Sequence, residues 1–160
     1  MELACGLTEE VIRNFGEVRL RVYGTSMVPS ILPGDLVLIQ QATLNEISQG
    51  EIVLFLRTGR LFVHRVVSQS AKSTVEGIEE AFLITRGDRL LEDDAPVCPS
   101  ELLGRVVCVE RDNRKIELKP VGSNRLLLRL LQSSDRVTSV YLRLAFYWRS
   151  IILGRAKCQV

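Results

Sequence analysis

Residues 51–68, EIVLFLRTGRLFVHRVVS, form two apolar runs separated by the dipeptide Thr58-Gly59. Both runs are rich in the β-branched, aromatic and other apolar residues that suit strands, and a Thr-Gly pair between such runs is typical of a tight hairpin turn. The pattern predicts two paired strands, Glu51–Arg57 and Arg60–Ser68. We therefore expect the core of this protein to be built on β structure.

Similar short runs, separated by turn residues, extend on both sides of this hairpin and predict a β-rich domain over residues 18–119. Asp112-Asn113 predicts a second tight turn, and Thr43-Leu44-Asn45-Glu46 has the spacing of a capping box and predicts one helical turn. The polar, acidic stretch Lys72–Glu80 predicts a loop. The other predicted strands are Val18–Tyr23, Leu36–Gln41, Ala81–Arg86, Gly104–Glu110 and Lys115–Lys119.

The last quarter of the chain, residues 120–160, has helical periodicity, which predicts helices over Ser123–Gln132 and Arg136–Leu153. Residues 1–119 hold 14 Lys and Arg against 18 Asp and Glu, whereas residues 120–160 hold 7 against 1. We therefore expect a basic amphipathic helical extension. The apolar residues predicted on one face of its second helix are Val137, Val140, Tyr141, Leu144, Trp148, Ile151 and Ile152.

This extension is not expected to span a membrane. Arg143 and Arg149 lie within its second helix, and an arginine at a helix centre costs roughly 2.5–3.5 kcal/mol on insertion scales. Three settings remain open for residues 123–155: packing on the β-rich domain, docking on a partner protein, or lying on an anionic membrane surface.

The first segment, residues 1–17, predicts a short helix over Thr8–Phe15, with Thr8 as its cap and Gly16 at its end. Met1–Leu20 carries several acidic residues and no apolar run of the length of a signal peptide or membrane span. We therefore expect a cytoplasmic protein, with peripheral membrane association as the variant that the basic extension would allow.

Metal and cofactor sites are not indicated. The cysteines, at positions 5, 98, 108 and 158, form no CxxC pair, and His64 is the sole histidine. We expect separate thiols in a reducing compartment and no cofactor.

His64 is also the sole imidazole that could activate a serine hydroxyl. Ser26 lies just after a predicted strand and before a segment with two prolines and a Gly-Asp turn, where a hydroxyl is expected to be accessible. A carboxylate normally orients the imidazole in such sites, and the polar loop with Asp88, Asp93 and Asp94 could supply one. A serine and a histidine 38 positions apart are weak support by themselves.

Four groups of residues, in order along the chain, resemble the motifs of the signal peptidase I and LexA-like serine peptidases. The resemblance implies a mainly β protein with the complex β-fold of that superfamily, here with a C-terminal helical appendage. Histidine in the second group is typical of the endoplasmic-reticulum and archaeal branch, whereas bacterial signal peptidases and LexA-like repressors have lysine there. The groups are Gly24-x-Ser26-Met27-x-Pro29 with Gly34-Asp35, Gly50-Glu51-Ile52-Val53 with Val63-His64-Arg65-Val66, Thr85-x-Gly87-Asp88 with Asp93-Asp94, and Leu103-Gly104-Arg105-Val106.

By this resemblance, Ser26 is the nucleophile, His64 the general base and Asp94 the orienting carboxylate, with Asp88 as the second candidate for that last role. The resemblance also implies an oxyanion hole that includes the backbone N–H of Ser26, with Thr25 as the nearest additional hydroxyl. An extended substrate would lie between the strand before Ser26 and the strand before His64. The residues expected to contact it are Val22, Tyr23, Gly24, Met27, Phe62 and Val63.

These residues predict a serine endopeptidase that cleaves an extended leader or precursor peptide, after small residues as the resemblance implies. The alternative is a non-catalytic peptide-binding or scaffold module on the same fold. Nucleic acid is not an expected partner, because the segment ahead of the β-rich domain is too short for a helix-turn-helix. Self-cleavage near Ala4-Cys5-Gly6 is a minor variant, since an extended N-terminal segment would be long enough to reach Ser26.

Overall fold

The computed structural model describes residues 2–73, 79–118 and 125–157. The chain divides into two compact units, Met1–Ser123 and Asn124–Val160. The first unit contains the whole sheet, and the second contains two helices.

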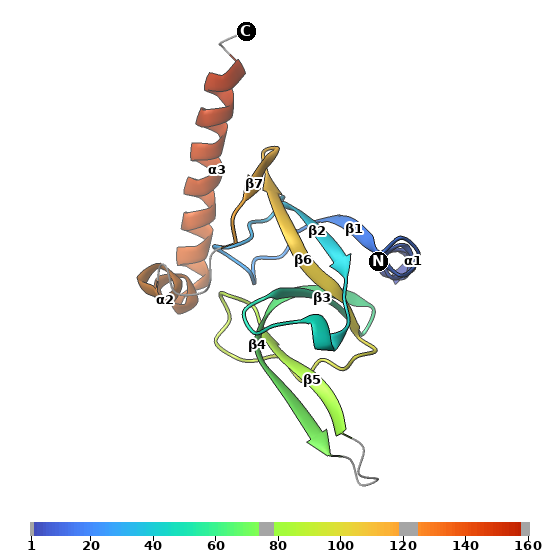
Figure 1. The fold of residues 1–160 in the computed structure, drawn as a ribbon. Coiled ribbons are helices and arrows are strands. Elements are labelled where there is room, and N and C mark those ends of the chain that lie inside the picture. Colours follow the sequence, from blue (N-terminus) through green and yellow to red (C-terminus); the bar gives the residue numbers. More distant parts are fainter. Residues whose placement is uncertain (1, 74–78, 119–124, 158–160) are drawn as a thin grey trace. The chain divides into compact units, whose positions relative to one another are not determined.

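The first unit is built on one antiparallel sheet, as the predicted mainly β class requires (Figure 1). Strand β6 is central, because it pairs with β2 along one edge and with β3 and then β7 along the other. The full order is β1-β2-β6-β3-β4-β5, with β7 beside β6. The strands are β1 (Glu17–Arg21), β2 (Leu36–Gln41), β3 (Ile52–Arg57), β4 (Arg60–Ser73), β5 (Glu79–Arg86), β6 (Leu102–Arg111) and β7 (Arg114–Ile116).

Both predicted tight turns are confirmed. Thr58 and Gly59 have φ of 49° and 69° between β3 and β4, and Asp112 and Asn113 have φ of 53° and 60° between β6 and β7. Consecutive positive φ values are typical of the two-residue turns that match the twist of antiparallel strands. The predicted turn at Thr43–Glu46 is also confirmed as the 3-10 helix η1 (Leu44–Glu46), in which the Glu46 carboxylate accepts bonds from Thr43.

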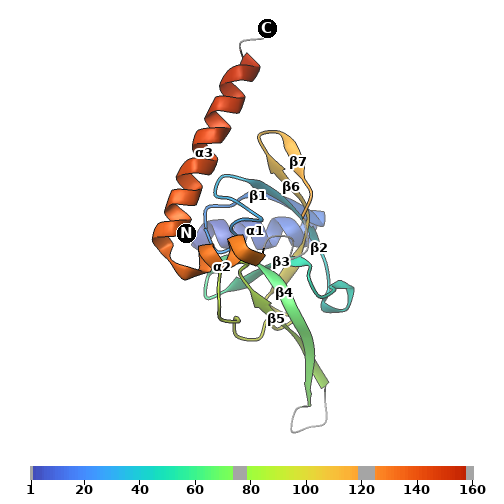
Figure 2. The ribbon, with the colours of Figure 1, turned by 90° about the vertical axis from the view of Figure 1, so that its left-hand side faces the viewer.

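The predicted loop over Lys72–Glu80 is wrong at both ends. β4 continues to Ser73 and β5 begins at Glu79, so their ladder pairs Lys72 with Glu80, and residues 74–78 lie outside the described residues. Polar side chains are compatible with strands in a two-stranded ribbon whose faces meet water, so their polarity alone does not indicate a loop. The ribbon of β4 and β5 extends beyond the rest of the sheet in both views (Figures 1 and 2).

Two hydrophobic clusters cover opposite faces of β3. Successive side chains of a strand point to opposite faces, and here Ile52 and Leu54 belong to the first cluster whereas Val53 and Phe55 belong to the second. All of them are buried. The sheet is therefore covered on both sides at β3, which explains the unbroken apolar run in the sequence.

Helix α1 (Glu2–Phe15) packs against β1, β2, β4 and β6. It begins six residues before the predicted start at Thr8, so Thr8 is not its cap. Cys5, Thr8 and Ile12 are buried at helical spacing, and this burial favours helix through the earlier residues as well. Gly16, with φ of 75°, ends the helix as predicted.

The second unit contains α2 (Arg125–Ser133) and α3 (Asp135–Lys157), in agreement with the two predicted helices. The buried Thr138 hydroxyl donates to the Leu131 carbonyl and so joins α3 to the end of α2. Residues 123 and 124 and the side chains of Ile151 and Ile152 lie outside the described residues. Among the described helices, none combines the length and the apolar character needed to cross a membrane.

Candidate active site

Ser26 lies in a turn that follows β1 and is anchored by its neighbours in sequence. Val22 N–H donates to the Asp35 carbonyl and Gly34 N–H donates to the Val22 carbonyl, so the two ends of the segment are tied together. Met27, Val28 and Ile31 are buried, whereas Ser26 itself is half-buried. Apolar burial of the following residues therefore holds the backbone of Ser26, while Ser26 itself stays partly exposed.

A second segment supports Ser26 from the loop after β5. Arg89 N–H donates to the Ser26 carbonyl at 2.9 Å. A Cβ at Gly87 would lie 2.8 Å from the Ser26 carbonyl oxygen and 2.9 Å from its Cβ, closer than such atoms approach. Glycine at position 87 thus allows this loop to pack directly against Ser26.

His64 is held by its position on β4. It pairs with Val53 in the β3–β4 ladder, so its side chain lies on the face of the second hydrophobic cluster. The rings of Phe55 and Phe62 each lie 6.0 Å from the imidazole, edge to face, and stack on one another at 5.3 Å. His64 is only 4% exposed, so these rings leave its imidazole little freedom to rotate.

Ser26, His64 and Asp94 form one continuous chain of contacts. The Ser26 Oγ lies 3.0 Å from His64 Nε2, and the Asp94 Oδ2 lies 2.6 Å from His64 Nδ1. The structure thus brings together three residues that are 38 and 30 positions apart in the sequence. A carboxylate on Nδ1 requires the proton there, which leaves Nε2 as an acceptor for the serine hydroxyl.

The Asp94 carboxylate is held in its ionised form. Burial alone would raise the pKa of Asp94, but hydrogen bonds from His64 and Thr85, together with the charges of His64 and Arg57, outweigh burial and lower that pKa. The Thr85 hydroxyl donates to Asp94 Oδ2 at 2.7 Å, and Asp94 N–H donates to the Thr85 carbonyl at 2.8 Å. An ionised Asp94 can stabilise an imidazolium at His64.

Arg57 holds the loop that carries Asp94, a contact that the sequence pattern did not indicate. Its guanidinium donates to the carbonyls of Ala95 and Pro96 at 3.0 and 2.8 Å. It also makes two bonds to the Glu101 carboxylate at 2.7 and 2.6 Å. Because Glu101 is 44 residues away, no local motif could have revealed this pairing.

Asp88, the second candidate for the orienting carboxylate, lies elsewhere. Its Oδ1 and Oδ2 accept bonds from the Arg65 guanidinium at 2.8 and 2.9 Å, and the Ser30 hydroxyl also donates to it. Arg65 donates in addition to the Gly50 carbonyl at 2.8 Å. In this structure the carboxylate that contacts His64 is Asp94.

The candidate substrate contacts on β4 lie on different faces. Phe62 packs on Phe55 and His64 in the second cluster, whereas Val63 packs against the first cluster. In the described part of the sheet, the β4–β5 ladder begins at Arg65, so Leu61–His64 are paired along one edge only, with β3.

The other candidate contacts surround Ser26. Tyr23 is 80% exposed and Gly24 is exposed, while Val22 is half-buried against the first cluster. Met27 is 1% exposed, so it presents almost no surface to a ligand here. The Thr25 hydroxyl lies 3.5 Å from the Arg89 guanidinium.

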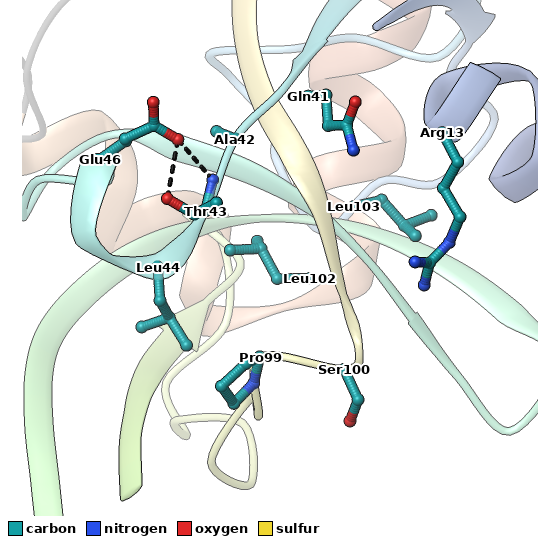
Figure 3. A pocket seen from close by; sticks show the side chains of 10 residues that line it. All are labelled: Arg13, Gln41, Ala42, Thr43, Leu44, Glu46, Pro99, Ser100, Leu102 and Leu103. Atoms are coloured by element: carbon teal, nitrogen blue, oxygen red, sulfur yellow. Dashed lines mark hydrogen bonds between the residues drawn. The ribbon is translucent and has the colours of Figure 1, made fainter. Parts of the chain in front are cut away.

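A cavity of about 430 Å³ lies away from these residues, between the end of α1, η1 and the start of β6 (Figure 3). Ser26, His64 and Asp94 are not among its lining residues. Its lining includes the apolar side chains of Leu44, Leu102 and Leu103 and the charged side chain of Arg13 (Figure 3).

Residues 7–76 match the model of the family described as Peptidase S24-like. This match supports the resemblance of the chain to the LexA and signal peptidase superfamily of serine peptidases. The matched residues include Ser26 and His64, whereas Asp94 lies beyond them. A search of curated protein sequences found no match to this chain.

Proposed function

We propose that this protein is a serine endopeptidase in which Ser26 is the nucleophile, His64 the general base and Asp94 the orienting carboxylate. The observation that supports this role best is the chain of contacts from Ser26 Oγ through both imidazole nitrogens to Asp94, at 3.0 and 2.6 Å. Distances of this size allow a proton to pass from the serine hydroxyl to the imidazole.

In the first half of the reaction, Ser26 Oγ attacks the carbonyl carbon of the scissile peptide bond and His64 Nε2 takes the hydroxyl proton. The carbonyl oxygen becomes an oxyanion, and the Asp94 carboxylate stabilises the new imidazolium. His64 then donates that proton to the leaving amine nitrogen as the carbon–nitrogen bond breaks. Ser26 remains as an ester of the substrate's acyl group.

In the second half, a water molecule attacks the ester carbon and gives a proton to His64 Nε2. The carbon–Oγ bond breaks, His64 returns the proton to Ser26, and the carboxylic product leaves. Backbone hydrogen bonds recorded for the described residues do not use Ser26 N–H as a donor. That N–H is therefore suited to stabilise the oxyanion in both halves.

The substrate would bind as an extended strand on the free edge of β4 at Leu61–His64, with the segment Val22–Gly24 on its other side. Main-chain pairing of this kind tolerates many sequences, so the side-chain pockets would set the preference. We propose an extended leader or precursor peptide with a small residue before the scissile bond, as the resemblance to signal peptidases and LexA-like peptidases implies; half-buried Val22 and exposed Gly24 precede Ser26 on the side proposed for the substrate.

Cleavage of a fluorogenic peptide with alanine before the scissile bond tests the proposal. We expect cleavage by the wild-type chain and by Ser68→Ala, a matched change at an exposed serine on β4, but not by Ser26→Ala. A fluorophosphonate, which loses fluoride when a serine oxygen attacks its phosphorus, should label Ser26 in the same pattern.

The outcome also separates the enzyme from a non-catalytic peptide-binding module. If wild-type protein binds the peptide but neither cleaves it nor reacts with the fluorophosphonate, the binding module is correct. Equal cleavage by wild type and Ser26→Ala would overturn the mechanism.

A further inference from the structure

One face of α3 carries a row of exposed apolar side chains, which we call the apolar stripe. At 3.6 residues per turn, residues at i, i+3, i+7, i+10 and i+11 lie on one face of a helix. Their exposed fractions run from 39% to 63%, which is unusual for such large side chains in a contiguous row. The stripe consists of Val137, Val140, Leu144, Tyr147 and Trp148.

The stripe is bordered by positive charge. Arg136 and Arg143 are exposed, and at 3.6 residues per turn both fall along one border of the stripe. Arginine side chains in this position can extend their guanidinium groups sideways to phosphates while the apolar residues are buried.

The charge of the whole unit also limits what can cover the stripe. Residues 120–160 hold 7 Lys and Arg against 1 Asp. Pairing of two copies through this face would bring two such units together and oppose their positive charges. An anionic surface has the complementary charge.

We propose that α3 docks on an anionic lipid surface through the apolar stripe. The helix would lie in the plane of the membrane interface, with the stripe toward the acyl chains and Arg136 and Arg143 at the lipid phosphates. Tyr147 and Trp148 suit this position, because their rings combine an apolar body with a polar group that can remain in the headgroup layer. The proposal is independent of the peptidase role.

Trp148 makes a direct test possible, because it is the sole tryptophan of the chain. Full-length protein is mixed with vesicles of phosphatidylcholine alone or of phosphatidylcholine with phosphatidylglycerol. With the anionic vesicles we expect the tryptophan emission to shift to shorter wavelength and to be quenched by brominated acyl chains. With neutral vesicles we expect little change, and added salt should weaken the anionic binding.

Variants separate the contribution of the arginine charges from that of the apolar stripe to vesicle binding. Arg136→Gln and Arg143→Gln should each weaken binding to anionic vesicles about fivefold, the factor expected for one charge near such a surface. Leu144→Gln keeps a good helix former and the Trp148 reporter, and should weaken binding by about tenfold or more. Phe15→Gln is the matched control, since it removes an exposed apolar side chain, 76% exposed, from α1 of the first unit.

Three outcomes would overturn the proposal. The first is the absence of a Trp148 shift with anionic vesicles, which would leave a protein partner or packing on the β-rich domain as the setting of this helix. The second is equal binding by Leu144→Gln, Phe15→Gln and wild type. The third is a stable dimer, measured by light scattering, that Leu144→Gln dissociates. Circular dichroism of each variant checks that the helices remain.

Discussion

Two neighbouring residues of β4, His64 and Arg65, are each at the centre of a polar cluster. The His64 cluster and the Arg65 cluster have the same kinds of partner but different chemistry. Each contacts one aspartate and one serine: His64 contacts Asp94 and Ser26, and Arg65 contacts Asp88 and Ser30. Successive side chains of a strand point to opposite faces, so the clusters are separate although their central residues adjoin.

The difference lies in what the central residue can do with a proton. A neutral imidazole accepts a hydrogen bond at one nitrogen while it donates at the other, whereas a guanidinium only donates and stays charged. Ser30 therefore donates to Asp88, while Ser26 faces an acceptor on His64. The His64 cluster suits proton transfer, and the Arg65 cluster suits holding β4, the Ser30 turn and the Asp88 loop together.

Replacing the central residues should separate the clusters most strongly. We expect His64→Gln to lower kcat for peptide cleavage by about a millionfold, since the proposed mechanism passes the Ser26 proton to His64 Nε2. Arg65→Lys, which keeps the charge, should retain measurable cleavage. Both are measured with the alanine-containing fluorogenic peptide, after circular dichroism confirms the fold. Strong cleavage by His64→Gln would break the comparison.

Two adjacent aspartates in the loop after β5, Asp93 and Asp94, allow a second test. Asp94→Asn should lower kcat about ten-thousandfold, because an amide no longer stabilises the imidazolium or fixes its tautomer. Asp93→Asn is the matched control, since this neighbour is exposed and pairs with Arg86 at 3.1 Å. Similar kcat values for the two variants would contradict the role of Asp94.

Asp88 should matter for stability rather than for proton transfer. Its side chain is 2% exposed and that of Arg65 is 9% exposed, so Asp88→Asn would leave a buried guanidinium without its counter-charge. We expect the free energy of unfolding to fall by about 3–5 kcal/mol. Urea denaturation measures this, with Asp93→Asn as the surface control, expected to lose no more than about 1 kcal/mol. Equal losses of unfolding free energy in the two variants would show that the Arg65 cluster does not stabilise the fold.

A smaller effect on kcat is expected at Arg57, which supports the His64 cluster by holding the loop that carries Asp94. Arg57→Gln should lower kcat by up to roughly a hundredfold, because the Asp94 loop loses its anchor and the imidazole is less well oriented. Arg60→Gln removes an exposed arginine from the same hairpin and should leave kcat unchanged. An unchanged kcat in Arg57→Gln would remove Arg57 from the positioning of His64.

The smallest effect concerns stability against pH. The pKa of Asp94 is lower in the folded state than in the unfolded state. Its ionised carboxylate therefore stabilises the fold above the unfolded-state pKa, about 3.9, and this stabilisation is lost as the pH falls through the folded-state pKa. The difference in unfolding free energy between wild type and Asp94→Asn should therefore shrink in acid. Urea titrations across this range measure it, and a constant difference would contradict the lowered pKa.

Much of the fold could be predicted from local pattern. The strand positions, the Thr58-Gly59 and Asp112-Asn113 turns and the two C-terminal helices follow from hydrophobic period and turn residues, which act over a few neighbours. The errors, at the start of α1 and at the ends of β4 and β5, occurred where tertiary burial or pairing extends an element beyond its local signal.

The candidate site divides in the same way. Sequence alone determined which residue types were available: one histidine, a serine in a turn after a strand, and an acidic loop. Only the tertiary structure decided that Asp94 rather than Asp88 contacts His64, and that Arg57 holds the Asp94 loop. Those pairings join residues 30 to 39 positions apart, and such pairings are set by strand register and by packing between elements, which local sequence does not encode.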